Sequence, residues 1–65
     1  MKAIISVNGK VVESKNFNST TSAREWADDK IDDYAMEYDG DVTERSPNRY
    51  EMESEDANIT IEIKK

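Results

Sequence analysis

The residues best placed to do chemistry in this sequence are carboxylates that recur at helical spacing between positions 25 and 37. On a helix, residues four apart lie in one row. The first row, the carboxylate ladder, consists of Glu25, Asp29, Asp33 and Glu37, and an adjacent row consists of Asp28 and Asp32. Like charges at this spacing destabilise a helix by about 0.2–0.5 kcal/mol per pair, and only Lys30 offers relief. That the helix keeps these charges despite the cost indicates that the rows form a binding surface. The alternative is that they only keep the domain in solution.

The chemistry open to such rows is imitation of a nucleic-acid backbone. Neighbouring carboxylates in a row lie about 6 Å apart, and duplex DNA carries one negative charge per roughly 1.7 Å of its axis. Rows of carboxylates can therefore occupy a groove lined by lysine and arginine, through the electrostatics that drive nonspecific DNA binding. The candidate partner-binding residues are Glu25, Asp28, Asp29, Asp32, Asp33 and Glu37, with Asp39, Asp41 and Glu44 extending the patch.

Two other uses of carboxylates, metal binding and catalysis, find little support. The segment Asp39-Gly40-Asp41 matches part of a calcium loop, but the other features of a full EF-hand loop are missing. The chain contains no histidine and no cysteine, which removes the usual zinc ligands, thiol nucleophiles and the commonest general base. Acid–base catalysis by paired carboxylates needs a pocket that separates their pKa values, and 65 residues leave little room for one. We therefore expect no enzyme activity, no cofactor and no metal site.

Charge is distributed unevenly along the chain, whose formal net charge is −6. Residues 25–56 hold thirteen acids and three bases, a net −10, whereas residues 1–24 hold four bases and one acid, a net +3. The basic residues are few and lie away from the aromatic ones, which disfavours direct nucleic-acid binding. The concentration of negative charge in one half of the chain favours a protein partner with a basic surface.

No segment has the pattern of an export signal or a membrane helix. The apolar run at residues 3–7 is too short for a signal peptide, and no stretch approaches the roughly 18 apolar residues of a membrane helix. The lack of cysteine in so small a domain favours a reducing compartment. These features predict a cytoplasmic protein that does not engage a membrane.

The carboxylate rows need a scaffold, and the first 17 residues predict a β-hairpin. Asn8-Gly9 is a strong signal for a two-residue type I′ turn, because both residues tolerate positive φ. A two-residue loop places Ile5 opposite Val12, and its inward face consists of Ala3, Ile5, Val7 and Val12. A three-residue loop shifts the pairing and brings Val11 and Phe17 inward instead. The sequence leaves these two registers open.

A helix is predicted to follow, beginning near Ser22 and ending near Tyr38. Ser22 and Glu25 fit a capping box, with Ser19 as a competing N-cap. Gly40 is suited to the left-handed conformation that ends a helix. The apolar stripe expected to face the sheet consists of Ala23, Ala27, Ile31, Tyr34, Ala35 and Tyr38.

The remaining chain predicts a loop over Asp41–Asn48 and then a second hairpin. Residues 50–54 and 59–63 alternate between apolar and polar types, and Glu55–Asn58 supplies the turn between them. The order ββαββ predicts an α+β fold with a single domain over residues 1–65. In this fold a four-stranded, mostly antiparallel sheet carries one helix on one face.

This layout resembles the immunoglobulin-binding domains of streptococcal protein G. The shared features are an Asn-Gly-Lys turn at Asn8–Lys10, a threonine-rich connector at Thr20–Ser22 and an acidic turn at Glu55–Ala57. The resemblance covers the whole chain in element order and implies the ββαββ fold. It also implies an alternative function, an adaptor or immunoglobulin-binding-like module that uses a sheet edge or the groove between the helix and the third strand. Trp26 and Tyr50 are its candidate aromatic anchors.

Length, acidity and the ββαββ plan together look like small phage-encoded proteins that block host machinery, of which anti-CRISPR proteins are the best-known group. That resemblance implies a non-catalytic, stoichiometric inhibitor that acts in the host cytoplasm. Its partner would be a nucleic-acid-handling defence complex, whose basic surface it occludes by DNA mimicry. A monomer and a homodimer paired through an exposed strand edge both fit the sequence. An acidic domain without a discrete partner is the third interpretation.

Overall fold

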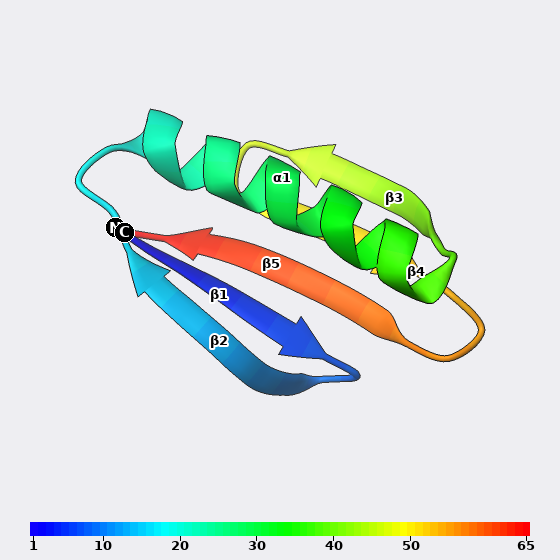
Figure 1. The fold of residues 1–65 in the computed structure, drawn as a ribbon. Helices are drawn as coiled ribbons and strands as arrows, with labels where there is room; N and C mark the ends of the chain where they lie inside the picture. Colours follow the sequence, from blue (N-terminus) through cyan, green and yellow to red (C-terminus); the bar gives the residue numbers. More distant parts are fainter.

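In the computed structural model, which describes residues 1–65, five strands form one antiparallel sheet and a single helix covers part of one face (Figure 1). The elements are β1 (Lys2–Val7), β2 (Lys10–Asn16), α1 (Thr20–Tyr38), β3 (Asp41–Ser46), β4 (Arg49–Glu53) and β5 (Asn58–Lys64). The strand order is β2-β1-β5-β4-β3, so β2 and β3 are the edge strands. The predicted α+β class is confirmed. No helix of the protein combines the length and the apolar character needed to cross a membrane.

The sheet has one strand more than the four predicted, because Asp41–Ser46 forms β3 where the sequence pattern predicts a loop. β3 pairs antiparallel with β4, and Pro47-Asn48 is the turn between them. An edge strand needs few apolar residues, and Val42 is the only one in β3. A bulge between Val42 and Glu44 also breaks the alternation by which a strand is recognised. The predicted four-stranded sheet is therefore corrected to a five-stranded one.

The first hairpin uses the two-residue turn, but a bulge alters its register. Asn8 and Gly9 have φ of 52° and 84°, as a type I′ turn requires. The register then shifts by one residue, so that Ile5 lies opposite Glu13 rather than Val12. Val12 is 54% exposed. Its predicted inward position is wrong, because the bulge displaces it from the alternation.

Strand β2 lies beyond the area that the helix covers. All seven of its residues are exposed, because α1 packs chiefly over β3, β4 and β5 (Figure 1). Val11, which the three-residue loop would turn inward, is 62% exposed, whereas Ala3 and Ile5 of β1 are buried as predicted.

Both edge strands carry a bulge, β2 at Val12 and β3 at Thr43. These bulges interrupt the row of backbone groups to which another strand would pair.

Helix α1 is capped by residues other than those favoured by the sequence pattern. Ser19, the competing candidate, is the N-cap, and its Oγ accepts a hydrogen bond of 3.2 Å from the amide of Ser22. Ser22 therefore lies inside the first turn and does not cap the helix. The helix ends at Tyr38 as predicted, but Asp39 rather than Gly40 adopts the left-handed conformation.

Gly40 serves close packing instead. A β-carbon at this position would lie 2.5 Å from Met52 Sδ and 2.6 Å from the backbone oxygen of Glu53. Both of these residues belong to β4. The absence of a side chain lets the chain leave α1 against β4 and enter β3 beside it.

The core lies between α1 and the central strands, and its small size fits a domain of this length. The eleven buried side chains are Ala3, Ile5, Ala23, Ala27, Ile31, Tyr50, Met52, Ala57, Ile59, Ile61 and Ile63. Of the predicted helix stripe, Ala23, Ala27 and Ile31 are buried, and the rest is half-buried against the core. This packing fixes the rotation of α1 about its axis and therefore decides which helix residues meet solvent.

Candidate acidic interface

The carboxylate ladder lies on the side of α1 that faces away from the sheet. All four of its side chains are exposed, because the opposite side of the helix is buried in the core. None of the four takes part in an ion pair. The fold thus leaves four like charges on one helix face without a counter-ion.

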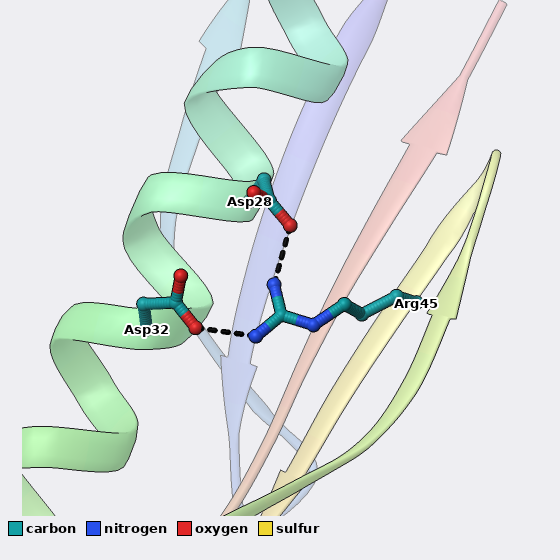
Figure 2. Close-up of polar contacts among 3 residues, drawn as sticks. All are labelled: Asp28, Asp32 and Arg45. Carbon is teal, nitrogen blue, oxygen red and sulfur yellow. Dashed lines mark hydrogen bonds and ion pairs between the residues drawn. The ribbon is translucent and has the colours of Figure 1, made fainter.

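The adjacent row of carboxylates is in a different situation, because Arg45 pairs with both of its members. Figure 2 shows the Arg45 side chain extending from β3 to Asp28 and Asp32. Nη1 of the guanidinium pairs with Asp28 Oδ1, and Nη2 pairs with Asp32 Oδ1. Two neighbouring carboxylates that receive two nitrogens of one fork form a charge-assisted clamp between helix and edge strand. The six helix carboxylates therefore divide into an unpaired ladder and a paired inner row.

Lys30, the one base within the helix rows, also turns away from the ladder. Its Nζ lies 4.0 Å from Glu13 Oε1 of β2 and 5.6 Å from the centre of the Trp26 ring. Trp26 in turn packs on Phe17 with ring centres 5.5 Å apart. The lysine thus links α1 to the β2 side of the sheet and gives the ladder no relief.

The two candidate aromatic anchors differ in exposure. Tyr50 is only 6% exposed and belongs to the core beneath α1, where burial raises the pKa of its phenol. A side chain buried to this extent cannot anchor a partner without unfolding, so Tyr50 is a structural residue. Trp26 is half-buried and keeps part of its ring at the surface.

Asp41 and Glu44 do not extend the ladder, because they lie on the opposite face of the sheet. Tyr50 and Met52 of β4 point into the core, so the alternate residues of β4 point to the open face. Residues directly opposite each other in a sheet share a face. The pairs Asp41–Glu53 and Glu44–Glu51 therefore form a second acidic surface, the open-face cluster. The third residue expected to extend the patch, Asp39, lies at the C-terminal end of α1 beside a shallow hollow with Tyr38, Glu55 and Asp56.

The open-face cluster is partly compensated. Like charges directly opposite each other destabilise a sheet, but Arg49 contacts Glu51 Oε1 at 3.0 Å and Glu62 Oε1 at 3.6 Å. The hydroxyl of Ser46 donates a hydrogen bond of 2.7 Å to Glu44, which lowers the pKa of that carboxyl. The three bases of residues 25–56, Lys30, Arg45 and Arg49, thus all pair with carboxylates outside the ladder.

One apolar side chain lies within the acidic helix face, and the sequence pattern does not single it out. Met36 is 83% exposed. It follows Asp32 by four residues and Asp33 by three, so it lies beside both on the helix surface. The signal available in the sequence is its position outside the apolar stripe, which a helical projection would reveal. The acidic face therefore carries a flexible apolar contact near its C-terminal end.

Neither a metal centre nor a known relative directs the interpretation of this surface. No group of three or more carboxylates is arranged to hold a metal ion. Comparisons with family models, curated proteins and solved structures find no match. The functional argument therefore rests on the geometry and charge of the two acidic surfaces.

The Arg45 clamp makes a testable contribution to stability. Arg45→Met should lower the free energy of unfolding by about 1 kcal/mol, because it breaks two half-exposed ion pairs and leaves Asp28 and Asp32 repelling each other. Urea unfolding measures this change. Lys10→Met, which removes an exposed and unpaired cation of β2, controls for the change in net charge. Equal stability of the two variants would show that the clamp contributes nothing.

Proposed function

We propose that this domain is a non-catalytic inhibitor that uses the carboxylate ladder of α1 to occupy a basic, nucleic-acid-binding surface of a host defence complex, in the manner of phage anti-CRISPR proteins. The observation that carries the proposal is the division of charge on α1. Two cations on the helix side of the sheet, Lys30 and Arg45, both pair with carboxylates other than those of the ladder. Ion pairs with the ladder would stabilise a surface that served only solubility. On a surface that binds a basic partner, the same internal pairs would weaken the binding, because they compete with the partner's cations.

The dimensions of the ladder set what it can imitate. Four helical residues advance about 6 Å, so the ladder spans about 18 Å of helix axis. One strand of duplex DNA places a phosphate about every 3.4 Å along its axis. The ladder therefore offers about half the charge density of a single strand. A cognate groove must supply closely spaced lysine or arginine side chains, and Met36 offers an apolar contact that a phosphate backbone lacks.

Neutralising the ladder tests the proposal. The variant Glu25→Gln, Asp29→Asn, Asp33→Asn and Glu37→Gln removes four of the net six negative charges. We expect it to keep its fold, because it relieves like-charge repulsion on the helix, and to lose at least about tenfold in partner capture from host lysate, because charge complementarity drives the encounter. Circular dichroism measures the first outcome, and quantitative pull-down measures the second.

A matched variant neutralises the open-face cluster instead. Asp41→Asn, Glu44→Gln, Glu51→Gln and Glu53→Gln bring the chain to the same net charge as the ladder variant. If the helix face is the interface, this variant should still capture the partner. Unchanged capture by the ladder variant would refute mimicry by α1. Loss by both variants to the same extent would assign binding to net charge rather than to a defined face.

The adaptor alternative is less well served by the structure. Its groove between α1 and β3 is bridged by the Arg45 clamp and by Arg24, whose Nε donates a 3.2 Å hydrogen bond to the backbone oxygen of Pro47. Its aromatic anchor Tyr50 is buried. Its remaining surface, the β2 edge with exposed Val11, is interrupted by a bulge. We therefore favour the carboxylate ladder as the binding surface.

A further inference from the structure

The turn between β1 and β2 contains a reactive dipeptide. Asn8 is followed by Gly9, and none of the other asparagines, Asn16, Asn18, Asn48 and Asn58, precedes a glycine. Both turn residues are exposed. Gly9 has no β-carbon to shield its backbone nitrogen, and no atom lies within 4 Å of the position such a carbon would take. The nitrogen that follows the Asn8 side chain is therefore sterically open.

The fold holds the Asn8 side chain by a contact with a distant strand. The backbone N–H of Asn8 donates a hydrogen bond of 2.8 Å to the backbone oxygen of Asn58. In return, the backbone N–H of Asn58 donates a hydrogen bond of 2.9 Å to the side-chain oxygen Oδ1 of Asn8. These two bonds tie the first turn to the start of β5, fifty positions along the chain. The carboxamide is thus part of the tertiary structure as well as of the turn.

We propose that Asn8 is a deamidation site whose reaction is gated by opening of this turn. The deprotonated backbone nitrogen of Gly9 attacks Cγ of Asn8, and a new C–N bond forms. The bond from Cγ to the side-chain nitrogen breaks, and that nitrogen leaves with protons from solvent as ammonia. Water then opens the cyclic succinimide at either carbonyl, and the products are aspartate or isoaspartate at position 8. The reaction needs no reagent other than water.

The native geometry opposes ring closure. In the left-handed conformation of a type I′ turn, Cβ of Asn8 and the nitrogen of Gly9 lie on nearly opposite sides of the bond between Cα and the carbonyl carbon. The five-membered ring requires them on the same side. Ring closure must therefore undo the positive-φ turn and release the bond to Asn58. The rate of deamidation consequently follows the fraction of molecules in which the β1–β2 turn is open.

The isoaspartate product would break the link that Asn8 makes between the β1–β2 turn and the start of β5. In isoaspartate the main chain runs through the former side chain, which lengthens the turn by one backbone atom. A type I′ turn has no room for that atom between Val7 and Lys10, which are paired across it. Both bonds to Asn58 then lose their geometry. Modification of this exposed turn would therefore also remove the contacts that the turn makes with the start of β5.

The experiment incubates the full chain in mildly alkaline buffer and follows each asparagine by peptide mapping with mass spectrometry. A free peptide covering residues 5–12 is the reference without a fold. We expect Asn8 to be the main modified residue and to react at least about tenfold slower in the folded chain than in the peptide. In guanidinium chloride the two rates should become equal. Asn18, which is exposed and makes no side-chain hydrogen bond, serves as the internal control whose rate changes little on unfolding.

Two results would overturn the inference. Equal deamidation rates for Asn8 in the folded chain and in the peptide would show that opening of the turn does not limit the reaction. Faster modification of another asparagine would show that Asn8 is not the site. Asn8→Asp provides the mass and chromatographic standard for the aspartate product.

Discussion

Gly40→Ala is expected to remove a large part of the stability of this domain. The new β-carbon would lie 2.5 Å from Met52 Sδ, 2.6 Å from the backbone oxygen of Glu53 and 3.0 Å from Ser54 Cβ. The methionine side chain can move, but the backbone of β4 is fixed by its pairing with β3 and β5. Overpacking costs about 1–3 kcal/mol, and a domain of this size has about 3–5 kcal/mol to lose.

Urea unfolding followed by circular dichroism measures this effect, and Gly9→Ala is its matched control. Gly9 has a positive φ of 84° but no atom near the position of a β-carbon. Alanine at that turn therefore pays a conformational cost of about 1–2 kcal/mol without a clash. We expect Gly40→Ala to be the more damaging of the two. A Gly40→Ala variant as stable as the wild type would show that the chain between α1 and β3 moves freely.

The second large effect is on the salt dependence of partner binding. Between low and physiological ionic strength, the affinity of the wild type for its partner should fall on the order of tenfold to a hundredfold. The reason is that four ladder carboxylates would replace about four phosphates in a basic groove. An apolar interface, as the adaptor alternative requires, should barely respond to salt. The slope of affinity against salt thus separates the two functions.

Isothermal titration over a series of sodium chloride concentrations measures that slope once the partner has been captured. The ladder variant provides the control, because its remaining binding should depend less steeply on salt. Met36→Ala should weaken binding without changing the slope, since it removes an apolar contact and no charge. A wild-type affinity that is flat across the series would contradict a ladder-driven interface.

Elements whose signal is local could be predicted from the sequence. The Asn8-Gly9 turn and the helix stripe with its buried Ile31 depend on near neighbours in the chain, and both are as expected. Elements decided by distant contacts could not be predicted. β3 contains one apolar residue and a bulge, and it becomes a strand because β4 lies beside it. The choice of Ser19 over Ser22 as the N-cap is likewise one that the local pattern leaves open, because both serines fit an N-cap.

The candidate interface shows the same division. Helical spacing alone places the carboxylate ladder on one face of α1, and the buried stripe turns that face to solvent. The sequence pattern cannot show that Arg45 pairs with Asp28 and Asp32, because the arginine comes from a strand that the pattern does not predict. The same missing strand hides the open-face cluster, since Asp41 and Glu44 acquire a face only when β3 joins the sheet.

The bulges at Val12 and Thr43 bear on how much of this protein a cell could hold. An inhibitor that works by occupancy, without turnover, has to be made in at least the same number of copies as its target. Accumulation at such levels endangers a small sheet protein, because exposed edges assemble into fibres and insoluble aggregates. A bulge in each outer strand makes the addition of a further strand at that edge less favourable. The proposed one-to-one blocking mechanism demands abundance, and bulged edge strands reduce the edge pairing that abundance would otherwise promote.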